Sequence, residues 1–401
     1  MSQGTAATGP HVLRRINAAA VLRALRDMGE QPARVSDLVL ATGLSRPAVS
    51  RAVSTLVAAR LVESLGSAQA QVGRPATRVR FRAESGHVAG VDIGPHRMTV
   101  LVADLAGTVR AERRVATPPK VTGAWLVRSL RGTLAKVVAD AKLAPSDLWA
   151  VAVGSPGIVD QERGEVRLAP SIPGWTGLPM LAELRNWLHC PVLVDNDVNL
   201  AVRAEQRLGS SADNLLYVHW GERIGSGIVI DGKPYRGASS AAGELGFLDL
   251  TTAVDEPPTP ATDGLGSFER LVGARAILQH AIDTCDGPLR EKLTATGDLA
   301  PLFDAAANGD QRALAVVHTV AARFARGLAT QLLILDPGLV VIGGGLSRAG
   351  DVLIDAVRQF LRPQLLTPIE VRASTLGDNA VAVGAVCKAL DAAEERIAMQ
   401  L

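Results

Sequence analysis

The chain has 401 residues, 47% of them hydrophobic and 20% charged, which supports two or three domains with a large buried core and excludes a mostly disordered protein. Its net charge of +2 conceals an asymmetry, because residues 1–82 hold 12 arginines and no lysine against 4 acidic residues, whereas the remainder holds 30 basic and 36 acidic residues. A basic N-terminal module on an acidic body indicates a nucleic-acid partner, although a solvated basic surface explains the charge equally well.

The cysteines and the ends of the chain indicate a cytoplasmic protein. Cys190, Cys285 and Cys387 are scattered and form no metal-ligand spacing, as expected of a reduced protein without disulfides. Residues 1–10 are small and polar and predict a disordered tail without a secretion signal. The most apolar run, residues 332–346, is interrupted by an aspartate, a proline and glycines, so we expect no membrane insertion.

Three short helices are predicted in the basic module. Apolar residues recur at helical spacing at Ala18, Val21, Leu22 and Leu25. They predict a first helix over about residues 13–28, closed by Gly29. Ser36 is the predicted cap of a second helix, and Gly43 suits the left-handed position at its end. After this tight turn, Ser45 is the predicted cap of a third helix, with Pro47 in its first turn.

The third helix has two different faces. Its apolar stripe consists of Val49, Val53, Leu56 and Val57, and its small basic face consists of Arg46, Pro47, Ser50, Arg51 and Ser54. Such a face after a short turn is typical of a recognition helix, in which arginine reads guanine edges in the major groove and serine contacts phosphates or bases. Residues 61–63 and 78–81 then predict two strands of a wing, whose tip carries Gly73 and Arg74. A basic three-helix module that binds protein is the alternative.

Further along the chain, polar or glycine-rich turns follow predicted strands. Residues 192–194 form a short apolar strand, and Asp195, Asn196, Asp197 and Asn199 follow it, where an open α/β sheet places its ligand cleft. An Asx-rich turn that merely ends the strand is the alternative. The other motifs are Val91-Asp92-Ile93-Gly94, Gly154-Ser155-Pro156-Gly157, Gly221-Glu222-Arg223-Ile224-Gly225, Ala242-Gly243-Glu244-Leu245-Gly246, Gly266-Ser267-Phe268-Glu269 and Val341-Ile342-Gly343-Gly344-Gly345.

In this order and spacing, the motifs resemble the ROK family of repressors, open reading frames and sugar kinases. The resemblance implies an α/β body of the actin-like ATPase fold over residues 84–401, preceded by a winged helix-turn-helix domain over residues 11–83. It implies a lobe I of about residues 84–199 plus a last helix over 381–396, and a lobe II of about residues 200–375. In repressors of this family the wing commonly carries Gly-Arg-Pro, which implies that Gly73 and Arg74 place an arginine in a narrow minor groove.

The same resemblance implies a sugar site in the body. Asp197 matches the aspartate that accepts the proton of the attacking sugar hydroxyl in kinases of the family. Asn196, Glu244 and Glu269 match residues that bind sugar hydroxyls. For the two glutamates a surface carboxylate is the alternative.

The phosphate loops depart from the family pattern. Pro95, His96 and Arg97 follow Asp92 and Gly94 where the family has Gly-Thr-Lys after Asp-x-Gly. The second loop, from Gly221 to Gly225, has Glu222 and Arg223 where the family pattern Gly-Thr-Gly-Ile-Gly has threonine and glycine. The glutamate would repel a triphosphate, and Arg223 could offset that repulsion. We therefore expect no productive ATP binding and no cofactor.

The structural zinc of many family members is also not expected. Its one histidine and three cysteines correspond here to Phe247, Pro260, Thr262 and Ser267, none of which is a zinc ligand of that kind.

The sequence thus favours a DNA-binding transcriptional regulator, a repressor of carbohydrate metabolism, that is not an enzyme. The expected partners are operator DNA and a sugar or sugar phosphate effector, in a homodimer or a dimer of dimers, because one recognition module reads only a half-site. The alternatives are an ATP-dependent sugar kinase with an added DNA-binding domain, and a regulator whose body serves only for dimerisation.

Overall fold

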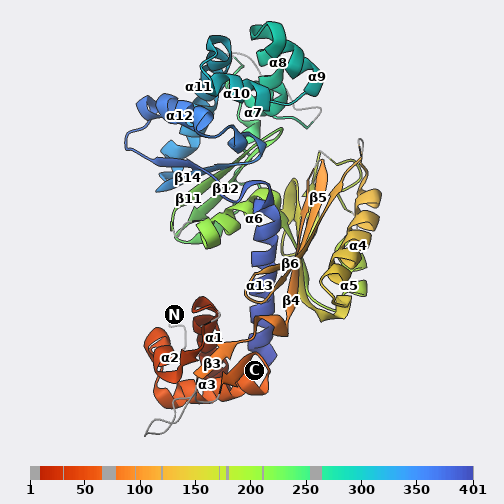
Figure 1. Ribbon diagram of the computed structural model, residues 1–401, viewed down its shortest axis with the longest axis vertical. Coiled ribbons are helices and arrows are strands. Elements are labelled where there is room, and N and C mark those ends of the chain that lie inside the picture. The colour runs from red at the N-terminus through yellow and green to blue at the C-terminus, as the bar shows by residue number, and fades with distance from the viewer. Residues whose placement is uncertain are drawn as a thin grey trace, which may run out of the picture.

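The computed structural model describes residues 10–29, 31–65, 78–94, 96–118, 121–170, 172–177, 180–209, 212–252 and 264–400. Figure 1 shows an N-terminal domain, two α/β lobes and one long helix, α13 (Ala380–Gln400), that runs from the lobes to the N-terminal domain. Every helix in these ranges is too short or too polar to cross a lipid bilayer.

The N-terminal domain is a three-helix unit closed by a small antiparallel sheet. Its elements are α1 (Pro10–Asp27), β1 (Ala33–Arg34), α2 (Val35–Thr42), α3 (Arg46–Ala58), β2 (Val62–Leu65) and β3 (Arg78–Phe81), with strand order β1-β3-β2. Gly43 ends α2 in the left-handed conformation, with φ of 65°, and Ser45 is the N-cap residue of α3, as the sequence predicts.

The predicted start of α2 is wrong. Arg34, rather than Ser36, is the N-cap residue, and Ser36 lies inside the first turn. The backbone N–H of Arg34 donates to Asp37 at 2.8 Å, so an aspartate three residues later satisfies the helix start. Arg34 also pairs with Arg78 across β1 and β3, and this strand contact fixes where the helix begins.

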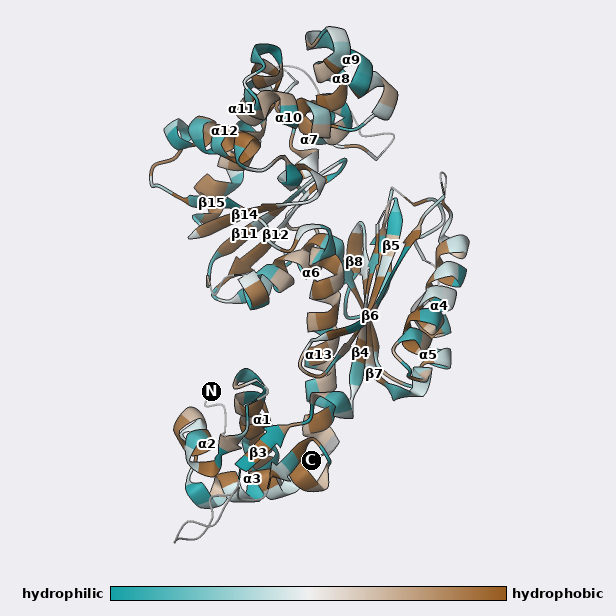
Figure 2. Ribbon diagram, in the orientation of Figure 1, coloured by the Kyte–Doolittle hydropathy of each residue, from teal (hydrophilic) through white to brown (hydrophobic). Residues whose placement is uncertain are grey.

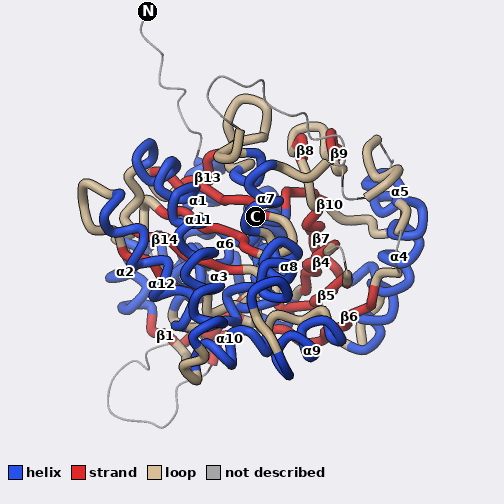
Figure 3. Tube along the Cα trace, turned by 90° about the horizontal axis from the view of Figure 1, so that it is seen from above, coloured by secondary structure: helices blue, strands red, loops and turns tan. Residues whose placement is uncertain are grey.

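Lobe I is built on a five-stranded mixed sheet. Its strands are β4 (His87–Ile93), β5 (Arg97–Asp104), β6 (Val109–Ala116), β7 (Leu148–Ser155) and β10 (Val192–Asn196), in the order β10-β7-β4-β5-β6. The helices α4 (Gly123–Asp140) and α5 (Met180–Trp187) cover its outer face, as Figures 1 and 3 show. A small hairpin, β8 (Ile158–Asp160) and β9 (Glu165–Leu168), stands apart from this sheet.

Lobe II repeats the same layering. Its strands are β11 (Leu215–Trp220), β12 (Ile224–Ile230), β13 (Lys233–Tyr235), β14 (Leu339–Gly343) and β15 (Glu370–Ala373), in the order β13-β12-β11-β14-β15. Its helices are α7 (Ser267–Val272), α8 (Ala274–Thr284), α9 (Gly287–Thr296), α10 (Ala300–Ala307), α11 (Gln311–Leu335) and α12 (Asp351–Leu361). The helix α6 (Asp197–Ala204) lies between the two lobes and packs against β12 and α13.

One hydrophobic core runs from the N-terminal domain into both lobes. It contains Leu22 and Leu25 of α1, Ala393 and Ile397 of α13 and Leu200 of α6, all of them buried. Figure 2 shows the apolar residues along α13 and along the strands beside it. The sequence predicts that the last helix packs on lobe I, and α13 does pack on β4 and β7, but it also packs on α1.

Candidate functional site

The ends of β4, β7 and β10 bring the predicted acidic residues to one level of the lobe I sheet. Asp92 of β4 and Asp195 of β10 both pair with Gly154 on the strand between them. A Cβ atom on Gly154 would lie 2.8 Å from a methyl group of Val381, so the glycine lets the start of α13 approach the sheet at this level. The sheet topology therefore groups residues that lie about a hundred positions apart.

Asp92 and Asp197 form a pair of carboxyl groups that share one environment. Burial and, to a smaller extent, the nearby charge of Asp197 raise the pKa of Asp92 to about 7, although Arg97 lowers it. Burial and, to a smaller extent, the charge of Glu244 raise the pKa of Asp197 to about 7, although the hydrogen bond from Val198 lowers it. Asp197 Oδ1 accepts a hydrogen bond of 2.8 Å from the backbone of Val198 at the start of α6. Such a pair can hold a proton near neutral pH.

Asn196 is the N-cap residue of α6. Its Oδ1 accepts a hydrogen bond of 3.0 Å from the backbone of Asn199, and its Nδ2 donates to the carbonyl of Gly157 at 2.9 Å. Both ends of the amide are thus held by backbone groups, which fixes its orientation at the edge of the site. A sugar hydroxyl would share these atoms with the backbone.

The two predicted glutamates lie near each other, on segments of lobe II. Glu244 is half-buried, and its pKa is raised by burial and by the charge of Glu269, while Arg223 lowers it. Glu269 is buried, and its carboxylate accepts from the backbone N–H groups of Ile224 and Gly266, both at 2.9 Å. Besides burial, the charges of Asp197, Glu244 and Glu269 thus raise the pKa values of Asp92, Asp197 and Glu244, respectively.

Arg223 lies in the turn between β11 and β12. Its Nη1 donates to Glu269 Oε2 at 3.1 Å and also to the carbonyl of Gly264. Glu269 thus has three donors within the protein, which leaves little of its carboxylate free for a ligand. The sequence predicts a sugar ligand or a surface carboxylate at Glu269, and its burial contradicts the second alternative. Its bond with Arg223 could not be predicted, because that contact depends on the fold.

Glu222 has partners other than Arg223. Its Oε2 lies 2.8 Å from His96 Nε2 of the first loop, and its Oε1 lies 2.7 Å from Arg275 Nε at the start of α8. Arg223 turns toward Glu269 rather than toward Glu222, and its effect on the repulsion of a triphosphate stays a prediction. The His96 contact also joins the two loops, and thereby the two lobes.

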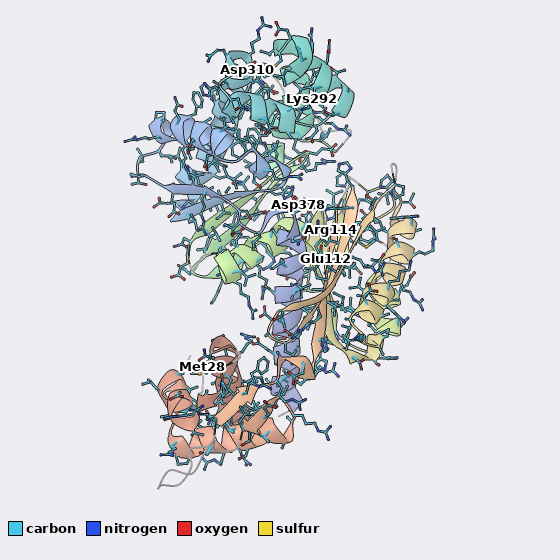
Figure 4. The ribbon with its side chains drawn as sticks, in the orientation of Figure 1. Met28, Glu112, Arg114, Lys292, Asp310 and Asp378 are labelled. Atoms are coloured by element: carbon cyan, nitrogen blue, oxygen red, sulfur yellow. The ribbon has the colours of Figure 1, made fainter. Side chains whose placement is uncertain are left out.

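The remaining loop residues have structural partners. Arg97 and Arg348 pair with Asp378, at 3.0 and 3.6 Å, and Arg114 donates to Asn379 at 3.1 Å. Figure 4 shows Asp378 and Arg114 where the edge of lobe I meets the chain leading into α13. The glycine run at the end of β14 is required by its backbone, because Gly344 has φ of +83° and a Cβ there would lie 2.6 Å from the carbonyl oxygen of Trp220. Gly94 follows β4 and Gly221 lies in the turn before β12, whereas Gly225 lies inside β12.

The predicted zinc-ligand positions lie partly outside the described residues. Pro260 and Thr262 fall there, while Phe247 is exposed and Ser267 begins α7. Within the described ranges, no three side chains of histidine, cysteine, aspartate or glutamate group so as to hold a metal ion.

The predicted DNA-binding face lies on α3. Arg46, Ser50, Arg51 and Ser54 are exposed on one side, whereas Val49, Val53 and Leu56 are buried on the other. Neither Arg46 nor Arg51 forms an ion pair with any residue that the structure describes, so both guanidinium groups are available to phosphates and bases. Gly73 and Arg74 lie outside the described residues.

Comparison with known proteins separates the two parts of the chain. Residues 88–392 match the model of the ROK family, and residues 14–70 match that of the MarR family. A glucokinase of Thermotoga maritima is 32% identical over 74% of this chain and 95% of its own length. A xylose repressor of Caldicellulosiruptor bescii is 24% identical over 94% of this chain and 95% of its own length.

A solved structure resembles nearly the whole chain. The crystal structure of a ROK family transcriptional regulator, a homologue of the E. coli MLC protein, has a TM-score of 0.78 and 21% identity, and covers 97% of this chain and 100% of that one. This likeness concerns the fold. Because the family model spans most of the sequence and a relative is 32% identical over nearly its full length, the chain belongs to the ROK family.

Proposed function

We propose that the protein is a sugar-responsive transcriptional repressor of carbohydrate metabolism. The exposed, unpaired Arg46 and Arg51 on α3 carry the proposal, because a basic face on the third helix of a winged helix-turn-helix is suited to the major groove. The xylose repressor matches both the N-terminal domain and the body, whereas the glucokinase matches the body alone. The proposed partners are operator DNA and a sugar or sugar phosphate, and the proposed place of action is the cytoplasm.

In this proposal the body binds its effector without catalysis. The proposed sugar ligands are Asn196, Asp197 and Glu244. Glu269 is expected to form fewer hydrogen bonds with the sugar, because its carboxylate already has three donors. The contact of His96 with Glu222 places side chains of this protein between the two phosphate loops. This contact supports a cleft that is not shaped for a triphosphate.

An ATP-dependent sugar kinase is the second candidate function. It is favoured by Asp197, which lies at the start of α6 with a pKa raised to about 7, a suitable value for a general base at neutral pH. Sugar-dependent consumption of ATP by the purified protein, lost in Asp197→Asn, would favour this function over the first.

We also propose a homodimer, or a dimer of dimers. Exposed apolar side chains of lobe II include Leu333 and Ile334 at the end of α11 and Leu366 before β15. Their segments precede β14 and β15, which are parallel neighbours in register, so these side chains lie toward the same end of the sheet. An apolar surface of this kind suits contact with a second copy, and two copies would present two recognition helices to the two halves of an operator.

Replacing Arg46 or Arg51 by alanine is expected to weaken binding to a specific operator by about 1 to 3 kcal/mol for each arginine that reads a base. An operator can be selected from random duplexes with the full-length protein, and affinity measured by fluorescence anisotropy. Arg128→Ala is the matched control, since Arg128 is an equally exposed arginine on α4 of lobe I. Unchanged affinity in both α3 variants would remove this face from DNA binding.

A further inference from the structure

Helix α13 connects the candidate sugar site with the DNA-binding domain. It begins beside the ends of β4 and β7 and ends beside α1, as Figure 1 shows. At 21 residues it is about 30 Å long, and it is one continuous helix. A displacement at its first turns would therefore be carried to its last turns.

A buried ion-pair cluster holds the middle of α13 to the sugar site. Asp195 Oδ2 accepts from Lys388 Nζ of α13 at 3.0 Å and from Arg236 Nη2 of lobe II at 3.1 Å. Asp195 Oδ1 accepts from the backbone N–H of Asn196 at 2.9 Å, so the same carboxylate also orients the loop that carries the proposed sugar ligands. One carboxylate thus joins lobe I, lobe II and α13.

Two acidic residues, Asp391 and Glu394, lie on the next turns of α13, closer to the DNA-binding domain. Asp391 pairs with Arg203 of α6 and, at 3.0 Å, with Arg207. Glu394 pairs with Arg26 of α1. Because Lys388, Asp391 and Glu394 are spaced three residues apart, they lie along one side of the helix. The backbone carbonyl of Ala398 also accepts from Arg15 Nε of α1 at 2.5 Å.

Burial makes the ion pair between Asp195 and Lys388 sensitive to the positions of these two side chains. The side chains of Asp195 and Lys388 are 2% and 13% exposed. Leaving a buried charge without its partner is costly, so Lys388 is expected to follow Asp195 when the loop moves. Arg236 belongs to the other lobe, and closure of the lobes around a ligand would change its distance from the same carboxylate.

We propose that Lys388 is the positioning residue that transmits the state of the sugar site, through Asp195 and α13, to α1 of the DNA-binding domain. The inference rests on the proposed function, since it assigns the route by which an effector alters DNA binding. The Nζ of Lys388 donates to Asp195 and, at 3.2 Å, to Gln161 Oε1, and neither of these residues is a proposed sugar ligand. Asp391 and Glu394 fix the far half of the helix to α6 and α1, respectively.

Hydrogen–deuterium exchange of the full-length protein tests this route without sugar or operator. In the parent, Asp195→Asn is expected to raise the hydrogen exchange rate of the α1 amides by about fivefold, because residues of one ion-pair network are energetically coupled. In a Lys388→Met background, Asp195→Asn is expected to change the exchange rate of the α1 amides by less than about twofold, as for two sites that are not energetically coupled. With Lys388→Arg, which retains the charge, the response of α1 is expected to return.

Arg236→Met serves as a second perturbation if Asp195→Asn does not fold, because it removes only the cation of lobe II. Arg113→Met removes an exposed ion pair with Asp140 on the far side of lobe I and is expected to leave α1 unchanged. An equal response of α1 in the parent and in the Lys388→Met background, or no response in either, would overturn the proposed route. Since the experiment uses no ligand, that outcome is distinct from a failure of sugar to affect DNA binding.

Discussion

Replacing Glu269 by alanine is expected to lower the free energy of unfolding by about 3 to 5 kcal/mol, because its buried carboxylate holds three donors. Two of these donors are the backbone N–H groups of Ile224 and Gly266, and each would cost about 1 to 3 kcal/mol if left buried without an acceptor. Arg223 is about one-third exposed, so water can replace part of its contact with the carboxylate. The change is measured by urea unfolding followed by circular dichroism.

Glu291→Ala is the matched control for this experiment. Glu291 is an exposed glutamate on α9 of the same lobe, and its loss is expected to change stability by less than about 0.5 kcal/mol. If Glu269→Ala lowers the free energy of unfolding by less than about 1 kcal/mol, the structural role of this carboxylate is contradicted and a role as a sugar ligand is favoured.

Replacing Asp92 by asparagine is expected to stabilise the free protein at pH 8 by about 2 to 4 kcal/mol, since a pKa difference of one unit corresponds to about 1.4 kcal/mol. The folded pKa of Asp92 is about 7, against an ordinary value of 3.8, so the folded state binds more protons between these values. Stability from this group is therefore present below pH 4 and is lost as the pH rises toward 7. Asparagine resembles the protonated form and removes the cost of ionisation, which Asp197 increases.

The melting temperature of parent and variant is compared at pH 4 and pH 8. The variant is expected to be more stable only at pH 8, because Asp92 is protonated at pH 4 in the folded state. Asp304→Asn, at an exposed aspartate on α10, is the control for the substitution itself. Equal differences at both pH values would contradict the raised pKa of Asp92.

Much of the architecture can be predicted from local patterns. Gly43 and Ser45 mark the turn before α3 because the left-handed conformation and the helix cap each favour a few residue types. The start of α2 could not be predicted from Ser36, because the strand contact of Arg34 with Arg78 competes with the serine cap. Such contacts depend on residues far away in the sequence.

The same limit applies within the site. Asp195 belongs to the polar stretch that the sequence identifies, but its partners Arg236 and Lys388 lie 41 and 193 positions further on. A lone lysine in an apolar helix gives no indication of its partner. Likewise, Glu222 and Arg223 are adjacent in sequence, yet they turn to different partners because one faces the other lobe and the other faces α7.

The most direct test of the proposed function is the affinity of the full-length protein for its selected operator, measured by anisotropy while sugars are added. A panel would include D-xylose, D-glucose, N-acetylglucosamine and their phosphates. We expect one of them to change the dissociation constant of the operator complex by at least about tenfold, which corresponds to about 1.4 kcal/mol of differential binding to the two states. No selected operator, or an operator affinity that is the same with every sugar, would contradict a sugar-responsive repressor.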